Sequence, residues 1–182
     1  MPELLSILRD IVLLRRGPQD LPYSPSALGT VAVATVAVSG VANSLLGEGV
    51  ESAMVRTAVL VALSLGLLYL LLLSQQRQAR FSQTALASLL VSAVFALVLL
   101  PVLVLSGPLP TPGTAPENVT GAQLLGMLAI IVVGLWKFVI DAHILRNALE
   151  IRLMPALLIV FAMEFAVTVL VSALFGKPPE GA

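Results

Sequence analysis

The chain has 182 residues, of which 58% are hydrophobic and only 11% are charged, and its mean hydropathy is +1.03. This composition excludes an ordinary soluble domain and indicates an integral membrane protein. Ten basic and ten acidic residues cancel, and no basic stripe with interleaved aromatic residues occurs, so no nucleic-acid partner is expected. The chain has no cysteine and one histidine, so no metal site and no cofactor is expected either.

Residues 1–16 predict an amphipathic helix that lies in the headgroup region of a membrane. Charged side chains follow one side of this helix, and leucine and isoleucine side chains occupy most of the remainder. The segment is too short and too polar to span a bilayer. Residues 17–26 form a Pro-rich elbow, in which Gly17 can stop the helix and Pro18 cannot continue it. We expect the elbow to turn the chain from the membrane surface toward the first span.

Five apolar segments follow in residues 27–182, each close to the roughly 20 residues that a ~30 Å hydrocarbon core requires. Backbone polar groups in lipid must be satisfied within their own segment, which favours helices over strands. The expected fold class is therefore all-α, a polytopic membrane protein with an interfacial N-terminal helix and a five-span transmembrane bundle. The predicted spans are about 27–47, 57–74, 84–106, 122–141 and 153–175.

Small residues recur at helical spacing on the first and third spans. They are Thr30, Ala34, Ala37, Gly40, Ser44 and Gly47 in the first span, and Ser88, Ser92 and Ala96 in the third. Small faces let helices approach closely in lipid. We expect them to pack these two spans against each other, and a self-association face is the alternative.

The basic residues predict the orientation of the chain. Eight of the ten Lys and Arg residues fall on one side of a five-span topology, and only Arg56 and Lys177 fall on the other. Because short loops rich in Lys and Arg stay in the cytoplasm, the N-terminus is expected there and the C-terminus outside. The candidates for contact with anionic lipid headgroups are Arg15, Arg16, Arg77, Arg80, Arg146 and Arg152. His143, in the same charged region, is expected to be solvated.

Glu164 is the most informative residue, because it lies roughly 16 Å into the fifth span, close to the bilayer midplane. An unpaired ionised carboxylate there costs about 3 kcal/mol or more, so Glu164 should be protonated, paired or facing water. Thr168 and Ser172 follow it at four-residue intervals. The three residues are therefore a candidate polar path along one face of the span.

Lys137, in the fourth span, is the predicted partner of Glu164. Helical side chains lean toward the N-terminus of their own helix, so in two antiparallel neighbours Lys137 leans deeper and Glu164 leans toward the cytoplasm. Asp141 lies one turn from Lys137 and competes for the same ammonium group. Two alternatives stay open, a protonated Glu164 with a local hydrogen bond and an ion or proton relay.

The C-terminal third reads LWKFVIDAHILRNALEIRLMPALLIVFAMEFAVTVLVSALFG. Through Trp136, Arg146 and the apolar spacing from Leu153 onward, it resembles the end of bacterial members of the Yip (Ypt-interacting protein) family. The resemblance implies a five-helix bundle without known catalysis, which we place in the bacterial inner membrane. No nucleophile elbow, phosphate loop or zinc-protease motif occurs, so the protein is expected not to be an enzyme and no catalytic residue is predicted.

These observations favour a non-enzymatic scaffold or accessory subunit. Its expected partners are the lipid bilayer, with anionic headgroups on the cytoplasmic side, and either another membrane protein or a second copy of the chain. The alternative is a small transporter or channel component with a polar path around Glu164. A cavity that reaches Glu164 favours transport, whereas a dry and paired Glu164 favours the scaffold.

Overall fold

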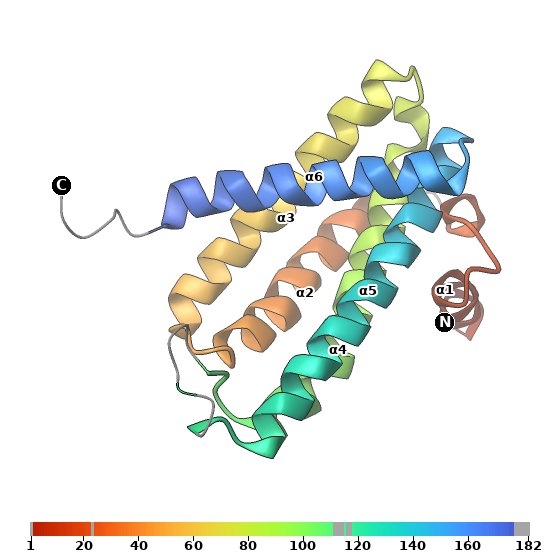
Figure 1. The fold of residues 1–182 in the computed structure, drawn as a ribbon. Coiled ribbons are helices and arrows are strands. Elements are labelled where there is room, and N and C mark those ends of the chain that lie inside the picture. Colours follow the sequence, from red (N-terminus) through yellow and green to blue (C-terminus); the bar gives the residue numbers. More distant parts are fainter. Residues whose placement is uncertain (1, 23, 111–114, 116–117, 177–182) are drawn as a thin grey trace.

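The structure, a computed structural model, describes residues 2–22, 24–110, 115 and 118–176. This part of the chain is helical and contains no strand (Figure 1). The elements are α1 (Pro2–Val12), η1 (Pro18–Asp20), α2 (Pro25–Ser44), α3 (Val50–Ser74), η2 (Gln78–Arg80), α4 (Phe81–Ser106), α5 (Gly121–Leu149) and α6 (Leu153–Phe175). The five helices α2 to α6 are long and apolar enough to cross a membrane, which confirms the predicted fold class.

Two of the long helices, α3 and α5, extend beyond the predicted spans by more than one turn. α3 begins at Val50 rather than near residue 57, and its first turns carry Glu51 and Arg56. α5 continues past Asp141 to Leu149, and its last turns bury apolar side chains against the bundle. Hydropathy places the ends of these two predicted spans at a charged residue, Arg56 or Asp141, whereas a helix ends where its backbone is capped.

Polar side chains cap the starts of α2 and α5. The Ser24 hydroxyl accepts a hydrogen bond from the Ala27 amide at 3.3 Å, and Pro25 occupies the first helical position. At α5, the Thr120 hydroxyl accepts from the Gln123 amide at 3.2 Å, while the Thr120 amide donates to Gln123 Oε1 at 2.9 Å. This reciprocal capping box satisfies amide groups that would otherwise lack a partner.

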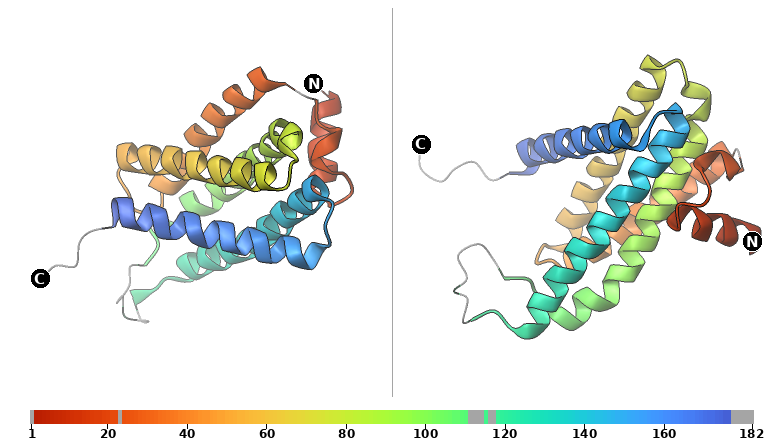
Figure 2. Two further views of the ribbon diagram at one scale, coloured as in Figure 1. Left: turned by 90° about the horizontal axis from the view of Figure 1, so that it is seen from above. Right: turned by 45° about the vertical axis from the view of Figure 1, so that its right-hand side comes forward.

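The five long helices form a closed ring. α2 packs against α3 and α4, α5 packs against α4 and α6, and α3 packs against α6 to complete the circle. Both views in Figure 2 show α5 and α6 meeting at their hairpin and diverging from it. The ring is therefore tight at the end that holds this hairpin and widens away from it.

The expected packing of the first and third spans is confirmed, but with different residues. α2 contacts α4 through the buried Thr35 and Ala42, and the Thr35 hydroxyl donates to the Leu89 carbonyl of α4 at 3.1 Å. In the predicted stripe Gly40 is buried and Ser44 is half-buried, whereas the others are exposed, namely Thr30, Ala34, Ala37 and Gly47. Small size makes close approach feasible, but it does not select which face is used.

α1 lies outside the ring, against α4 and α5 (Figure 1). Its Ile7, Leu8 and Ile11 side chains are buried among apolar residues of those two helices. Leu5, and Leu13 directly after the helix, are exposed. The surface that α1 offers to lipid is thus smaller than expected, because protein covers much of its apolar face.

The elbow after α1 is tied to the bundle by hydrogen bonds. Gln83 Nε2 donates to the Leu21 carbonyl at 2.7 Å, and His143 Nε2 lies 2.9 Å from the Arg16 carbonyl. His143 is buried, which corrects the expectation that it is solvated. The reason is that the elbow folds back over α5 and removes its imidazole from water.

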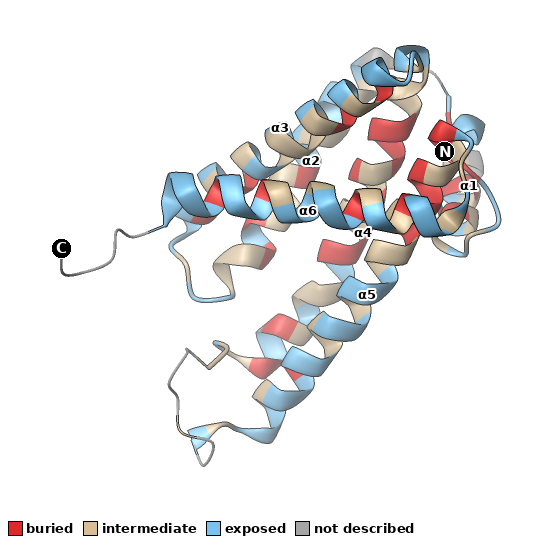
Figure 3. Cartoon of the chain, turned by 45° about the horizontal axis from the view of Figure 1, so that its top comes forward, coloured by how far each residue is buried: buried red, intermediate tan, exposed pale blue. Residues whose placement is uncertain are grey.

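The outer faces of the long helices are apolar and exposed (Figure 3). On α5 and α6 they carry Leu124, Leu128, Leu135, Leu158, Phe161 and Phe165. An apolar surface of this extent is unfavourable in water and suits the hydrocarbon of a bilayer. Lipid is therefore the environment that the surface fits.

Candidate functional site

A cavity of about 380 Å³ lies inside the helix ring, within the size range of small-molecule sites. All five long helices contribute to its wall. Leu68, Leu145 and Val160 belong both to this wall and to a buried apolar cluster near the α5–α6 hairpin. Packed side chains therefore bound the cavity at the tight end of the ring.

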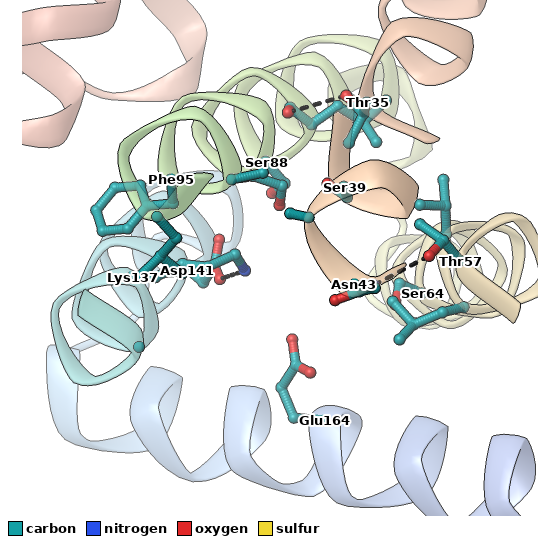
Figure 4. Close-up of a pocket in the computed structure, with 18 of the residues that line it drawn as sticks. Thr35, Ser39, Asn43, Thr57, Ser64, Ser88, Phe95, Lys137, Asp141 and Glu164 are labelled. Carbon is teal, nitrogen blue, oxygen red and sulfur yellow. Dashed lines mark hydrogen bonds and ion pairs between the residues drawn. The ribbon is translucent and has the colours of Figure 1, made fainter. Parts of the chain in front are cut away.

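Hydroxyl and amide groups from α2, α3 and α4 form the polar part of the wall (Figure 4). Asn43 Nδ2 donates to the Thr57 hydroxyl at 3.0 Å and links α2 to α3 across the cavity edge. Four serine hydroxyls of the wall have no hydrogen-bond partner among the described residues, namely Ser39, Ser64, Ser88 and Ser92. Each is a donor and an acceptor that is free to bind water or a solute.

Three ionisable side chains face this cavity, and two of them pair with each other. Lys137 Nζ lies 2.6 Å from Asp141 Oδ2, one turn further along α5. The Lys137 side chain is 30% exposed and that of Asp141 is 13% exposed, so the pair is largely shielded. The two charges neutralise each other within one helix. Their electrostatic attraction at this separation is stronger than it would be in open water.

Glu164 is the third ionisable group, and it points from α6 into the cavity (Figure 4). Its carboxylate makes no ion pair or hydrogen bond among the described residues. It remains within electrostatic range of Lys137 and Asp141. Glu164 is also exposed, so solvent reaches it in the isolated chain.

The predicted Lys137–Glu164 pair is therefore not formed as a direct contact. The ammonium group of Lys137 binds Asp141, the competitor that lies only four residues away on the same helix. An i,i+4 partner is already in place once the helix forms, whereas Glu164 must be brought close by packing of a second helix. Because α6 diverges from α5, Glu164 makes no ion pair or hydrogen bond with Lys137.

Thr168 and Ser172 do not line the cavity, which corrects the predicted polar path. Both are exposed on α6, and the Thr168 hydroxyl donates to the backbone carbonyl of Glu164 at 2.8 Å. Four residues of helix rotate by about 40° more than one full turn, so successive i+4 steps drift off a face. Glu164 is the last residue of α6 that reaches the cavity.

Three of the predicted headgroup-binding arginines interact with protein. Arg77 and Arg80 both pair with Glu150, and Arg80 Nη1 also donates to the carbonyls of Asn147 and Ala148 at 3.2 and 3.1 Å. Arg80 thereby caps the C-terminal end of α5. Arg16 pairs with Asp10 at 3.4 Å.

The other three predicted arginines are Arg15, Arg146 and Arg152. None of them forms an ion pair within the described part of the chain. They leave positive charge at the end of the bundle that also holds Arg77 and Arg80. Contact of these side chains with headgroups stays a prediction.

The sequence predicts the acidic residue of the cavity, Glu164, but not most of the cavity wall. The spacing of Ser88 and Ser92 indicates helix packing, and no sequence pattern distinguishes Ser39, Asn43 and Ser64. The available signal is the presence of polar side chains within spans one to three, where lipid offers them no partner. Only the ring arrangement shows that these side chains converge.

No group of three or more acidic or histidine side chains that could hold a metal ion occurs within the described ranges. Comparison of the chain with family models, with curated proteins and with solved structures gave no match. The resemblance to the Yip family therefore stays a prediction, and the candidate function is argued from the site itself.

Proposed function

We propose that the protein binds a small polar solute in the central cavity and moves it across the membrane, as a transporter or as a component of one. The observation that supports this proposal is the unpaired Glu164 carboxylate facing a cavity that also holds the Lys137–Asp141 pair. A carboxylate in the middle of a bundle is costly unless water, a proton or a ligand accompanies it. The cavity provides room for each of these.

A scaffold role explains the cavity less well. A scaffold gains stability from a filled interior, whereas this one leaves four serine hydroxyls and one carboxylate without a protein partner in the described chain. Catalysis is also a poorer proposal, because Asp141 binds the ammonium group of Lys137. A lysine whose ammonium group is bound by a carboxylate is not available as a general base for one of the nearby serines.

We further propose that the protein resides in the bacterial inner membrane with its N-terminus in the cytoplasm. The basic loops support this orientation, because the N-terminal arginines and the α3–α4 and α5–α6 hairpins lie at one end of the bundle. Anionic headgroups on that side would contact Arg15, Arg146 and Arg152.

The transport proposal is tested with purified protein in liposomes. We would measure entry of three labelled probes of different charge, tetraethylammonium, glycerol and benzoate, and compare Ser88→Phe with Ala37→Phe. The first substitution places a phenyl ring in the cavity, whereas the second lies on an exposed face of α2. Entry of at least one probe should be lost with Ser88→Phe and kept with Ala37→Phe.

Folding controls and a second cavity variant make this outcome decisive. Size-exclusion profiles and melting temperatures establish that both variants are folded, and Ser64→Phe fills the cavity from α3 as a second test. If folded wild-type protein passes none of the three probes faster than empty liposomes, the transport proposal is wrong and the scaffold becomes the better explanation.

A further inference from the structure

We propose that the cavity accepts a monovalent organic cation and that this cation and a proton occupy the Glu164 carboxylate in turn. This inference rests on the proposed transport function and specifies its substrate class. It implies one-for-one exchange, in which a cation entering the cavity displaces a proton from Glu164.

The charge of the cavity favours a cation. Its only ionisable lining groups among the described residues are Lys137 and Asp141 from α5 and Glu164 from α6. Helices α2, α3 and α4 contribute hydroxyl and amide groups but no charge. Because Lys137 and Asp141 neutralise each other at 2.6 Å, the ionised Glu164 gives the cavity a single net negative charge. One positive charge on a ligand balances it.

The size and wall of the cavity favour an organic cation over a bare metal ion. A volume of about 380 Å³ would hold on the order of ten water molecules, far more space than one desolvated ion fills. Much of the wall is apolar, with Leu60, Val61, Leu65, Phe95 and Leu99 around the polar groups. An ammonium group bearing alkyl substituents can contact Glu164 with its charge and the leucines with its carbon.

Exchange follows from the cost of a lone charge in the membrane interior. With the cavity empty of cation, a proton on Glu164 removes that cost. When a cation enters, the carboxyl releases its proton to cavity water and the resulting carboxylate pairs with the cation. One positive charge leaves as one arrives, so the net reaction is electroneutral. The cavity cannot hold the proton and the cation at the same time without an uncompensated positive charge.

Asp141 is a positioning residue in this scheme. By binding Lys137 it keeps the ammonium group from pairing with Glu164, which lies within electrostatic range. Asp141→Asn should therefore free Lys137 to occupy the site as an internal cation and block exchange. The double variant Lys137→Met with Asp141→Asn removes that competitor and should restore exchange, which a merely structural role of Asp141 would not predict.

The test uses the full chain in liposomes with a pH-sensitive dye in the lumen and the membrane potential clamped with potassium and valinomycin. Adding tetraethylammonium outside should make the lumen alkaline in wild type. The rate should fall by about tenfold or more in Glu164→Gln, because the paired charge is lost. Glu51→Gln, at an exposed position near the start of α3, is the matched control and should behave as wild type.

The outcomes separate this inference from the transport proposal. Proton release that depends on tetraethylammonium and on Glu164, and that returns in the double variant, supports the exchange. Equal tetraethylammonium entry in wild type and Glu164→Gln overturns it. Entry of glycerol or benzoate through a cavity that excludes tetraethylammonium also overturns it but leaves transport standing. If none of the three probes enters, both proposals fail.

Discussion

Four serine hydroxyls in the cavity wall indicate whether the cavity contains water. In a lipid-facing helix a serine commonly donates to a carbonyl one turn earlier, as Ser44, Ser52 and Ser74 do here with the carbonyl three residues back. The cavity serines form no such bond in the described chain. A hydroxyl without a protein partner costs little free energy when it contacts water, but it costs considerably more in a dry cavity. We therefore expect water in the cavity.

Thiol labelling checks this expectation, because the chain has no cysteine of its own. Ser64→Cys and Ser88→Cys should react with a water-soluble, membrane-impermeant methanethiosulfonate reagent in intact proteoliposomes. Ser172→Cys, which is exposed on α6 but does not line the cavity, is the control and should stay unreactive in lipid. Equal protection of all three thiols would show that the cavity is closed to water.

Glu150 supports a pH prediction outside the membrane. Hydrogen bonds from Arg80 and Arg77 lower the pKa of Glu150 below its ordinary value of 4.5. A carboxyl with a lowered pKa stabilises the fold above its ordinary pKa, and that contribution is lost as pH falls through the lowered value. The melting temperature of wild type in detergent should therefore drop below about pH 5.

The matched variant for this prediction is Glu150→Gln. It should melt slightly below wild type at pH 7, and its melting temperature should depend less on pH below 5. The effect is small because the Glu150 side chain is 55% exposed, and added salt should reduce it further. A Glu150→Gln variant with the same acid sensitivity as wild type would assign that sensitivity to another group.

At the scale of the elements, three helices end in the same unusual way. α1, α3 and α5 are each followed by a residue in the left-handed conformation, and none of these is glycine: Leu14, Gln76 and Glu150 have φ of 59°, 56° and 57°. At α3 the Arg77 amide bonds to the Leu72 carbonyl at 2.7 Å and the Gln76 amide to the Leu73 carbonyl at 3.0 Å. These bonds form the Schellman motif, in which glycine is favoured.

Gln76→Gly should therefore stabilise the protein by about 1 kcal/mol, because glycine adopts this conformation without a clash of its Cβ. The melting temperature in detergent should rise. Gln75→Gly is the control, since Gln75 has a φ of −95° and gains nothing from glycine. A rise for both variants, or for neither, would contradict the proposed strain at Gln76.

The packing of α1 against α4 and α5 supports a second prediction at the scale of the elements. Ile11 is fully buried against α4 and α5, whereas Leu5 is 64% exposed. Truncating a buried isoleucine costs about 2 kcal/mol or more, so Ile11→Ala should loosen α1 and raise the rate of tryptic cleavage after Arg15 and Arg16 by about tenfold or more. Leu5→Ala should leave cleavage unchanged. The opposite ranking would mean that α1 is held by lipid through its outer face.

The sequence predicts the elements of this fold better than their contacts. Hydropathy found all five long helices, because lipid imposes length and apolarity on each span independently. It could not tell which apolar face of α1 meets protein, since Leu5 and Ile11 have the same chemistry. The predicted pair of Lys137 and Glu164 rests on side-chain direction and chain order, and neither gives a measure of how far α6 diverges from α5. Relations between helices depend on packing, which periodicity does not encode.

At the scale of the whole molecule, the two ends of the helix ring differ in charge. One end holds the N-terminal arginines and two arginine-bearing hairpins, joined by contacts between Arg80 and Glu150 and between His143 and the Arg16 carbonyl. At the start of α3, near the other end, Arg56 pairs with Glu48 at 2.8 Å. Pairing with a carboxylate does not cancel the effect of an arginine on orientation, because orientation follows the basic residues rather than the net charge.

This asymmetry predicts that a C-terminal alkaline phosphatase fusion after Gly176 is active and that a fluorescent protein fused there is dark, since the first works outside the cytoplasm and the second inside it. A phosphatase fused after Gln76, in the α3–α4 hairpin, should be inactive. Neutralising Arg77 and Arg80 together should not reverse these results, because Arg15, Arg16, Arg146 and Arg152 remain on the same side. A fluorescent C-terminal fusion together with an inactive phosphatase fusion would show that the orientation is the opposite of the one proposed. The cation would then enter the cavity from the other side of the membrane.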